Sequence, residues 1–114
     1  MIKNILPALI LTLTGCSALQ VFSYDSLPVV RATVTQGATK SSVISAAGMP
    51  DSEILIKSNQ NTCLNYTLRK DNKTTPFFII VNSRNQVTNY GYVSCGTAIE
   101  EGHAAPTEPM KQRL

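Results

Sequence analysis

The sequence FFIIV, from Phe77 to Val81, decides the fold of this chain. It is an unbroken apolar run rich in β-forming residues, and such a run predicts a strand that is covered on both faces. Polar turn formers follow at residues 82–85, and residues 87–93 then read as the next strand. The run is therefore expected to be a central strand with a hairpin partner on its C-terminal side.

The segment before the central run predicts a second antiparallel neighbour. Residues 63–68 alternate between two sets of side chains, which is the period of a half-buried strand, and Asp71-Asn72-Lys73 supplies the turn. Glu53 to Lys57 alternates weakly and is interpreted as either a further strand or an extended arm. Together these segments predict an antiparallel meander of three or four strands.

Two short amphipathic helices are predicted ahead of the strands. Apolar residues spaced three and four apart indicate a helix over residues 27–36, which Gly37 ends. Thr39 is a candidate N-cap for a second helix, which ends at Gly48. The predicted fold class is α+β, with two short N-terminal helices packed on one face of a three- to four-stranded antiparallel meander.

Charge and composition exclude a nucleic-acid partner. The formal net charge is only +3 at pH 7, and the dense Lys/Arg stripe that phosphate backbones require is missing from the sequence. Arg69, Lys70 and Lys73 flank the predicted turn and are interpreted as a solvated hairpin tip. A patch that binds lipid headgroups is the alternative.

An enzymatic site is not predicted. His103 is the sole histidine and lies beside Glu100 and Glu101 in a polar segment expected to be disordered, where no general base is held near a target. These three residues also lack the several thiolate or imidazole ligands of a transition-metal site. Gly91 and Gly96 lie in and after a strand, so neither begins a phosphate-binding helix. We expect a non-enzymatic chain without metal or cofactor.

The N-terminus has the anatomy of a secretory signal. An apolar run follows Lys3 and ends in Leu13-Thr14-Gly15-Cys16. This ending resembles the lipobox of bacterial lipoproteins, which implies cleavage between Gly15 and Cys16 and attachment of fatty acyl chains such as palmitate to Cys16. An ordinary secretory signal with an incidental cysteine is the alternative. A transmembrane helix is disfavoured because the run is well short of about 20 residues.

The acyl anchor sets the expected location and organisation. Several acyl chains hold a protein on a membrane almost permanently. Ser17, where an Asp would signal retention in the inner membrane, points by the same resemblance to the outer membrane, with the folded part facing the periplasm. The predicted parts are a signal peptide (1–15), a lipid-anchored tether (16–26), a domain (27–97) and a disordered polar tail (98–114).

Once Cys16 carries lipid, Cys63 and Cys95 remain as an even pair in an oxidising compartment. A bridge between them would stabilise the fold by about 3–4 kcal/mol in the chain-entropy model. In a simple meander, however, the two cysteines lie about 17 Å apart on opposite edges, whereas bridged Cα atoms lie within about 7 Å. A disulfide therefore requires that the chain turn back after Gly91 or that the strand order differ. Two buried thiols that never meet are the alternative.

The predicted helical hairpin resembles a group of small envelope lipoproteins. The order and spacing of Val30, Gly37, Thr39, Gly48 and Pro50 resemble the SmpA/OmlA (BamE-like) lipoproteins of the β-barrel assembly machinery.

The cysteine motifs resemble the osmotically inducible lipoprotein E (OsmE) family more closely. TCLNY (62–66), GYVSC (91–95) and Pro50-Asp51-Ser52-Glu53 match motifs of that family. The similarity covers about residues 13–96, and Ala38 departs from it where the family more often has Met.

The resemblance implies a periplasmic module on the inner face of the outer membrane, linked to envelope integrity and osmotic stress. It also implies a fold like that of β-lactamase inhibitor proteins, and an envelope protein as a partner besides the membrane lipid. Tyr66, Tyr90 and Tyr92 are candidate contact residues because tyrosines suit interfaces; simple packing on the sheet is the alternative. A module that binds a small ligand or inhibits an enzyme in the periplasm is the second functional hypothesis.

Overall fold

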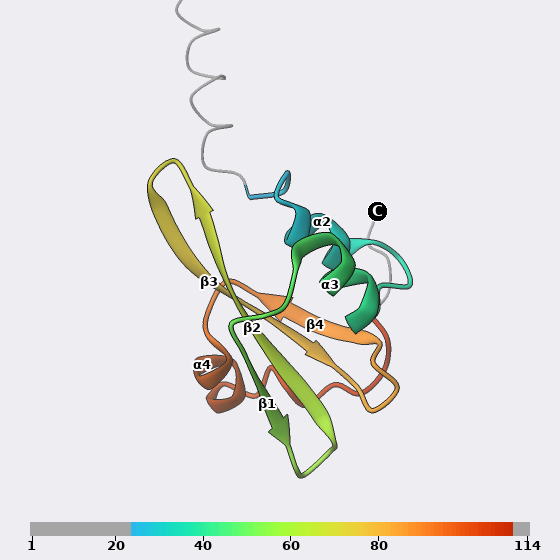
Figure 1. The fold of residues 1–114 in the computed structure, drawn as a ribbon. Helices are drawn as coiled ribbons and strands as arrows, with labels where there is room; N and C mark the ends of the chain where they lie inside the picture. The colour runs from blue at the N-terminus through green and yellow to red at the C-terminus, as the bar shows by residue number, and fades with distance from the viewer. Residues whose placement is uncertain (1–23, 111–114) are drawn as a thin grey trace, which may run out of the picture.

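Four antiparallel strands in sequence order form the sheet around which the chain is built (Figure 1). The computed structural model describes residues 24–110. The strands are β1 (Ser52–Ile56), β2 (Asn61–Lys70), β3 (Lys73–Val81) and β4 (Val87–Gly91). The weakly alternating segment at Glu53 is thus a strand, and the predicted four-stranded form of the meander is confirmed.

The N-terminal predictions fall outside the described residues. These are the signal peptide (1–15), the cleavage position between Gly15 and Cys16, the acylation of Cys16, and residues 16–23 of the tether. Within residues 24–110, no helix is long and apolar enough to cross a membrane.

The central strand is buried on both faces, as its apolar run predicts. Residues 77–81 of β3 are at most 2% exposed. Their side chains alternate between two separate cores, one on each face of the sheet. The core on the helix side contains Phe77, Ile79, Val81, Leu64, Tyr66, Leu68, Val87, Val29, Val30 and Val43. The core on the other side contains Cys63, Phe78, Ile80, Cys95, Ala98 and Ala104.

The two predicted N-terminal helices are α2 (Pro28–Val34) and α3 (Lys40–Ala47). The α3 N-terminus is a capping box: the Thr39 hydroxyl accepts a hydrogen bond from the Ser42 amide at 3.1 Å, and the Ser42 hydroxyl accepts one from the Thr39 amide at 2.9 Å. Gly48, at φ +88°, ends α3 as predicted. The helix α2 ends at Val34, two residues before the predicted end.

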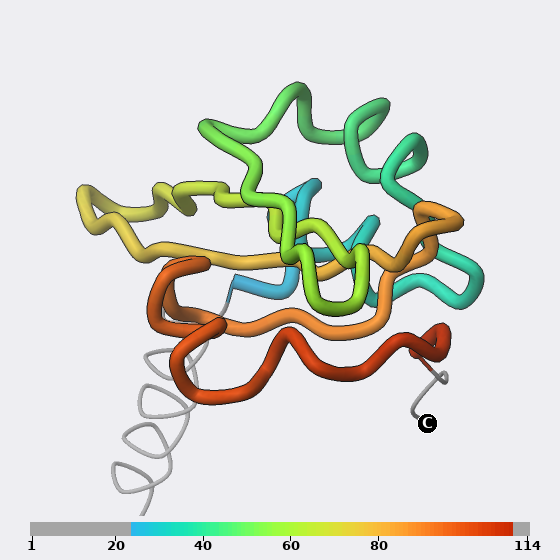
Figure 2. Tube along the Cα trace, turned by 90° about the horizontal axis from the view of Figure 1, so that it is seen from below, coloured from blue at the N-terminus to red at the C-terminus, as the bar shows by residue number. Residues whose placement is uncertain are grey.

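The other face of the sheet carries a third helix, α4 (Cys95–Glu100), followed by residues 101–110, which we call the C-terminal strap. Figure 2 shows this segment on the side of the sheet opposite α3. The prediction of a disordered tail over residues 98–114 is therefore wrong for residues 98–110. Its polar composition hid the small apolar side chains of Ala98 and Ala104, which are at most 5% exposed and pack against β2 and β3.

Asparagine side chains of the sheet region hold the C-terminal strap by its backbone. The Asn61 Nδ2 donates to the carbonyls of Ala104 and Pro106, both at 2.9 Å. The Asn82 Nδ2 donates to the Thr107 carbonyl at 3.0 Å. Because a buried backbone carbonyl needs a partner, these donors allow a polar segment to lie on the sheet. The folded unit extends at least to residue 110, beyond the predicted boundary at 97.

A disulfide joins Cys63 of β2 to Cys95 at the start of α4, with the two Cα atoms 5.9 Å apart. The strand order is the simple meander, so the bridge depends on the other condition named above, a reversal of the chain after Gly91. The strand β4 ends at Gly91 rather than at the predicted residue 93, and the chain bends over residues 92–94. This reversal brings Cys95 back over the face of the sheet on which Cys63 lies.

Candidate interaction surfaces

The three predicted contact tyrosines do not form one surface. Tyr66 lies in the helix-side core at 7% exposure, and its hydroxyl donates to the Gly48 carbonyl at 2.7 Å. Burial, together with the nearby charges of Glu53 and Asp51, raises the pKa of Tyr66 above its usual value. Tyr66 therefore ties β2 to the end of α3, which is the packing role left open above.

Tyr90 and Tyr92 belong to an aromatic cluster near the first described residue. The ring of Phe77 lies 5.8 Å from that of Tyr90 and 5.2 Å from that of Tyr92, and Tyr24 lies 6.0 Å from Tyr92. Tyr92 is 42% exposed. Its pKa is raised by burial first, then by the charge of Asp25 and by Tyr90. Of the three tyrosines, Tyr92 alone offers an exposed aromatic face.

Tyr24 attaches the N-terminal segment to the sheet. Its hydroxyl makes a 2.9 Å hydrogen bond with the Thr75 hydroxyl of β3. The last three residues of the predicted tether (24–26) are thus part of the folded unit.

The basic residues Arg69, Lys70 and Lys73 lie at the tip of the β2–β3 hairpin. Lys70 and Lys73 are direct cross-strand partners, and the two turn residues between them, Asp71 and Asn72, both have positive φ, as a two-residue hairpin turn requires. The tip is largely solvent-exposed, in agreement with a solvated hairpin end.

Large exposed apolar side chains gather on the opposite edge of the sheet from β4. Met49 is 70% exposed, Leu55 55% and Ile54 38%. Two of them belong to β1, which is one of the two edge strands of the sheet, and Met49 precedes it. Sequence reasoning missed this surface, because the run Ile54-Leu55-Ile56 indicates a strand and does not reveal that its outer side is open.

Three polar contacts hold β1 in place and leave its outer side open. The Asn65 Nδ2 donates to the Ser52 hydroxyl at 3.0 Å, and the Thr67 hydroxyl donates to the Asp51 carboxylate at 2.8 Å. The Lys40 Nζ lies 2.9 Å from the Glu53 Oε1. They join β1, or Asp51 directly before it, to β2 or α3, so the edge is presented as an ordered strand.

Three hollows on the described surface are small or open to solvent. A groove of about 230 Å³ runs over the beginning of α2, the end of α3 and residues 66–69 of β2. A wider, open depression of about 350 Å³ lies over α2, and a pocket of about 70 Å³ lies beside residues 37–39. Small-molecule sites typically enclose about 300–1,000 Å³ and bury most of the ligand, and none of these three hollows combines that size with enclosure.

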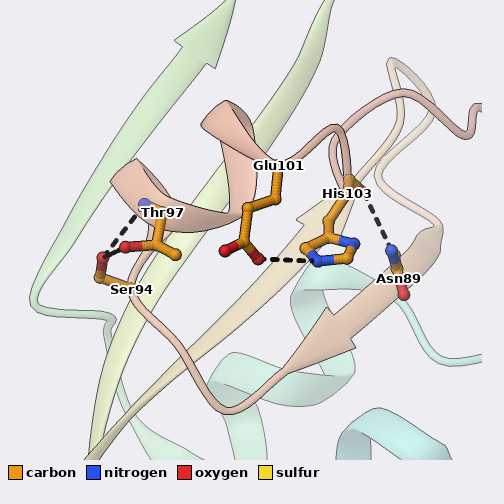
Figure 3. Close-up of polar contacts among 5 residues, drawn as sticks. All are labelled: Asn89, Ser94, Thr97, Glu101 and His103. Atoms are coloured by element: carbon orange, nitrogen blue, oxygen red, sulfur yellow. Dashed lines mark hydrogen bonds and ion pairs between the residues drawn. The ribbon is translucent and has the colours of Figure 1, made fainter.

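His103 is ordered, contrary to the prediction that it lies in a disordered tail. Its Nε2 lies 3.2 Å from the Glu101 Oε1, and its carbonyl accepts from the Asn89 Nδ2 at 2.9 Å (Figure 3). Its ring also stacks on Phe78 at 5.9 Å. Residues 24–110 contain no group of three or more His, Cys, Asp or Glu side chains suited to a metal ion.

Comparisons with known proteins agree with the resemblance seen in the sequence. No family model matches the chain. The chain is 28% identical over 99 residues to the Escherichia coli K12 protein named "Osmotically-inducible putative lipoprotein OsmE", covering 86% of this chain and 88% of that protein. The protein of the same name from Escherichia coli O157:H7 gives the same values.

A crystal structure described as an osmotically inducible lipoprotein OsmE has the same fold. It superimposes with a TM-score of 0.63 at 23% sequence identity, covering 72% of this chain and 85% of that one. The sequence homology and this structural match together confirm the predicted resemblance to the OsmE family.

Proposed function

We propose, because the chain is a homologue of OsmE, that it is an envelope lipoprotein of the OsmE type, held on the outer membrane by acyl chains on Cys16 and facing the periplasm. The homology over 86% of the chain carries this proposal. The sequence Leu13-Thr14-Gly15-Cys16 supplies the acceptor cysteine, and the Cys63–Cys95 disulfide suits an oxidising compartment. The two helices on an antiparallel sheet also fit the BamE-like relationship suggested by the sequence.

The proposed role is to support envelope integrity or the response to osmotic stress by binding another protein, without enzymatic activity. Exposed Leu55, Ile54 and Met49 beside an open strand edge form a surface of the kind that binds proteins. The small or open hollows give less support to the alternative of a small-ligand-binding or inhibitory module.

The anchor is tested by replacing Cys16 with Ala in the native host. We expect accumulation of the uncleaved precursor and loss of labelling by radioactive palmitate. Ser17→Asp is the matched variant: it should keep the label and move the protein to the inner-membrane fraction. Continued labelling of Cys16→Ala would refute the lipoprotein assignment, and recovery of the wild-type protein in the inner-membrane fraction would refute the outer-membrane assignment.

The role is tested by deleting the gene and measuring leakage of periplasmic enzymes after an osmotic upshift. We expect greater leakage from the deletion strain, restoration by the wild-type chain, and no restoration by the unanchored Cys16→Ala chain. Affinity capture of the acylated protein from detergent extracts should recover an envelope protein. Unchanged leakage together with an empty capture would reject the proposed role.

A further inference from the structure

Apolar exposure in this protein is concentrated at one place. Among residues 24–110, four large hydrophobic side chains are exposed, and three of them, Met49, Ile54 and Leu55, lie on β1 or just before it. The other three strands bury their apolar residues in the two cores. An edge strand with exposed apolar side chains and unpaired backbone groups on its outer side can accept another strand.

The charges of this edge are arranged for pairing with a second copy of itself. Glu53 of β1 lies two residues before Leu55, and Lys57, the first residue of the turn that follows β1, lies two residues after it. If two copies of β1 pair antiparallel about a two-fold axis at Leu55, Glu53 of each copy lies opposite Lys57 of the other. We propose that the protein forms a homodimer in which two β1 strands pair antiparallel, centred on Leu55, and join the two sheets into one.

The apolar side chains of β1 match in the same register. Leu55 then lies beside the second copy's Leu55, and Ile54 lies opposite the second copy's Ile56 on the other face of the joined sheet. Opposite charges or apolar pairs placed directly across two strands stabilise their pairing, whereas like charges destabilise it.

Neighbouring registers lose this match. A two-fold axis at Ile54 places the Glu53 carboxylate opposite Leu55, and an axis at Ile56 places the Lys57 ammonium opposite Leu55. An axis at Glu53 places two carboxylates against each other. An axis between two residues is excluded, because it would set a residue whose backbone groups point toward the partner strand opposite one whose backbone groups point away from it.

The dimer also suits attachment of both copies to one surface. A two-fold axis normal to the joined sheet keeps α2 and α3 of both copies on the same side. It also places Tyr24 of both copies at the same height along the axis. The inference stands independently of the proposed envelope role, since it rests on the described residues of β1 and its neighbours Met49 and Lys57.

Charge reversal tests the pairing in the full-length chain. Glu53→Lys sets Lys against Lys at both ends of the paired strands, and Lys57→Glu sets Glu against Glu. Each variant should weaken the homodimer about tenfold, because two attractive cross-strand pairs become repulsive. The readout is co-purification of two differently tagged copies from detergent-solubilised membranes.

The decisive experiment mixes a copy of each variant and measures their co-purification. A Glu53→Lys copy and a Lys57→Glu copy restore two opposite-charge pairs, so the mixed pair should co-purify as well as two wild-type copies. The Glu53→Lys change also breaks the Lys40–Glu53 ion pair within each copy. If the loss of that ion pair were the reason for weaker co-purification, mixing the two variants would not restore it. Glu100→Lys, the same charge change at an exposed position of α4, is the matched control and should leave co-purification unchanged.

A photo-crosslinking residue at position 55 provides the second readout. Irradiation of intact cells should give a product of twice the monomer mass that carries both tags. Three results would each overturn the proposed dimer. Wild-type copies could fail to co-purify, or every charge variant could co-purify as well as the wild type. The third is a crosslink from position 55 that joins only a different protein.

Discussion

Opening the Cys63–Cys95 disulfide is the perturbation whose effect the structure defines best. The two cysteines are 32 positions apart in the sequence, and both are fully buried. For a closed loop of that length, the chain-entropy relation gives a loss of about 3.7 kcal/mol in the free energy of unfolding. In a domain of this size each kcal/mol lowers Tm by about 4–8 °C, so we expect a decrease of about 15–30 °C.

The loss of stability should be largest on the face of the sheet that carries α4 and the C-terminal strap. The helix α4 has six residues, too few to be stable in isolation, and the disulfide is its covalent attachment to β2. The strap that follows α4 depends on the hydrogen bonds from Asn61 and Asn82. We therefore expect faster amide exchange over residues 95–110 than over β3 in the opened protein.

The assay compares the wild-type chain with a Cys63→Ala/Cys95→Ala double variant. Urea denaturation followed by circular dichroism gives the free energy of unfolding, and hydrogen exchange gives the local effect. Wild-type protein treated with a reductant is the control for the small volume lost with the two sulfur atoms. Typical mutational effects exceed about 0.5 kcal/mol, so unfolding free energies of the wild type and the double variant that agree within that value would refute the reasoning. Amide hydrogen exchange that is equally fast on both faces of the sheet in the double variant would refute it as well.

The remaining predictions concern single side chains. Gly91→Ala should destabilise the fold by about 1–3 kcal/mol in thermal unfolding, because the new Cβ would lie 2.6 Å from the Phe78 ring; Gly96→Ala meets no atom closer than 3.9 Å and should be tolerated. Asn61→Ala removes two donors to the strap and should cost about 1–3 kcal/mol, with earlier proteolytic cleavage within residues 104–110; unchanged cleavage would contradict it. The raised pKa of Tyr66 favours its neutral form in the folded state, so its contribution is complete below the unfolded value of about 10 and is lost as pH rises through the folded pKa. Tyr66→Phe should therefore lower stability at neutral pH by about 1 kcal/mol through loss of the bond to Gly48, and flatten the decline above pH 10; an equally steep decline in both proteins would contradict the assignment.

Local sequence patterns determined most of the helix-side half of the fold. The run Phe77 to Val81 indicated a strand covered on both faces, and the structure buries all five residues. Thr39 and Gly48 marked the ends of α3, because an N-cap hydroxyl and a glycine with positive φ act within one helical turn. Such signals are readable because cause and effect lie a few residues apart.

The second face of the sheet depended on contacts between distant segments. Ala98 and Ala104 become core residues only because the chain reverses after Gly91 and the disulfide fixes α4 against β2. The backbone of a polar tail is satisfied there by Asn61 and Asn82, which precede it by 25 or more positions. No local pattern carries that information, and composition alone therefore indicated disorder.

The candidate surface was likewise decided by tertiary structure. From the sequence alone Tyr66 and Tyr92 were equal candidates, but packing against α3 buries the first, whereas the second lies beyond β4 and stays partly exposed. The residues Ile54 and Leu55 became a surface because β1 is at the edge, where strand order leaves one side of its backbone unpaired. Alternation along a strand shows which residues share a face, whereas the position of that strand in the sheet determines whether its edge is open to a partner.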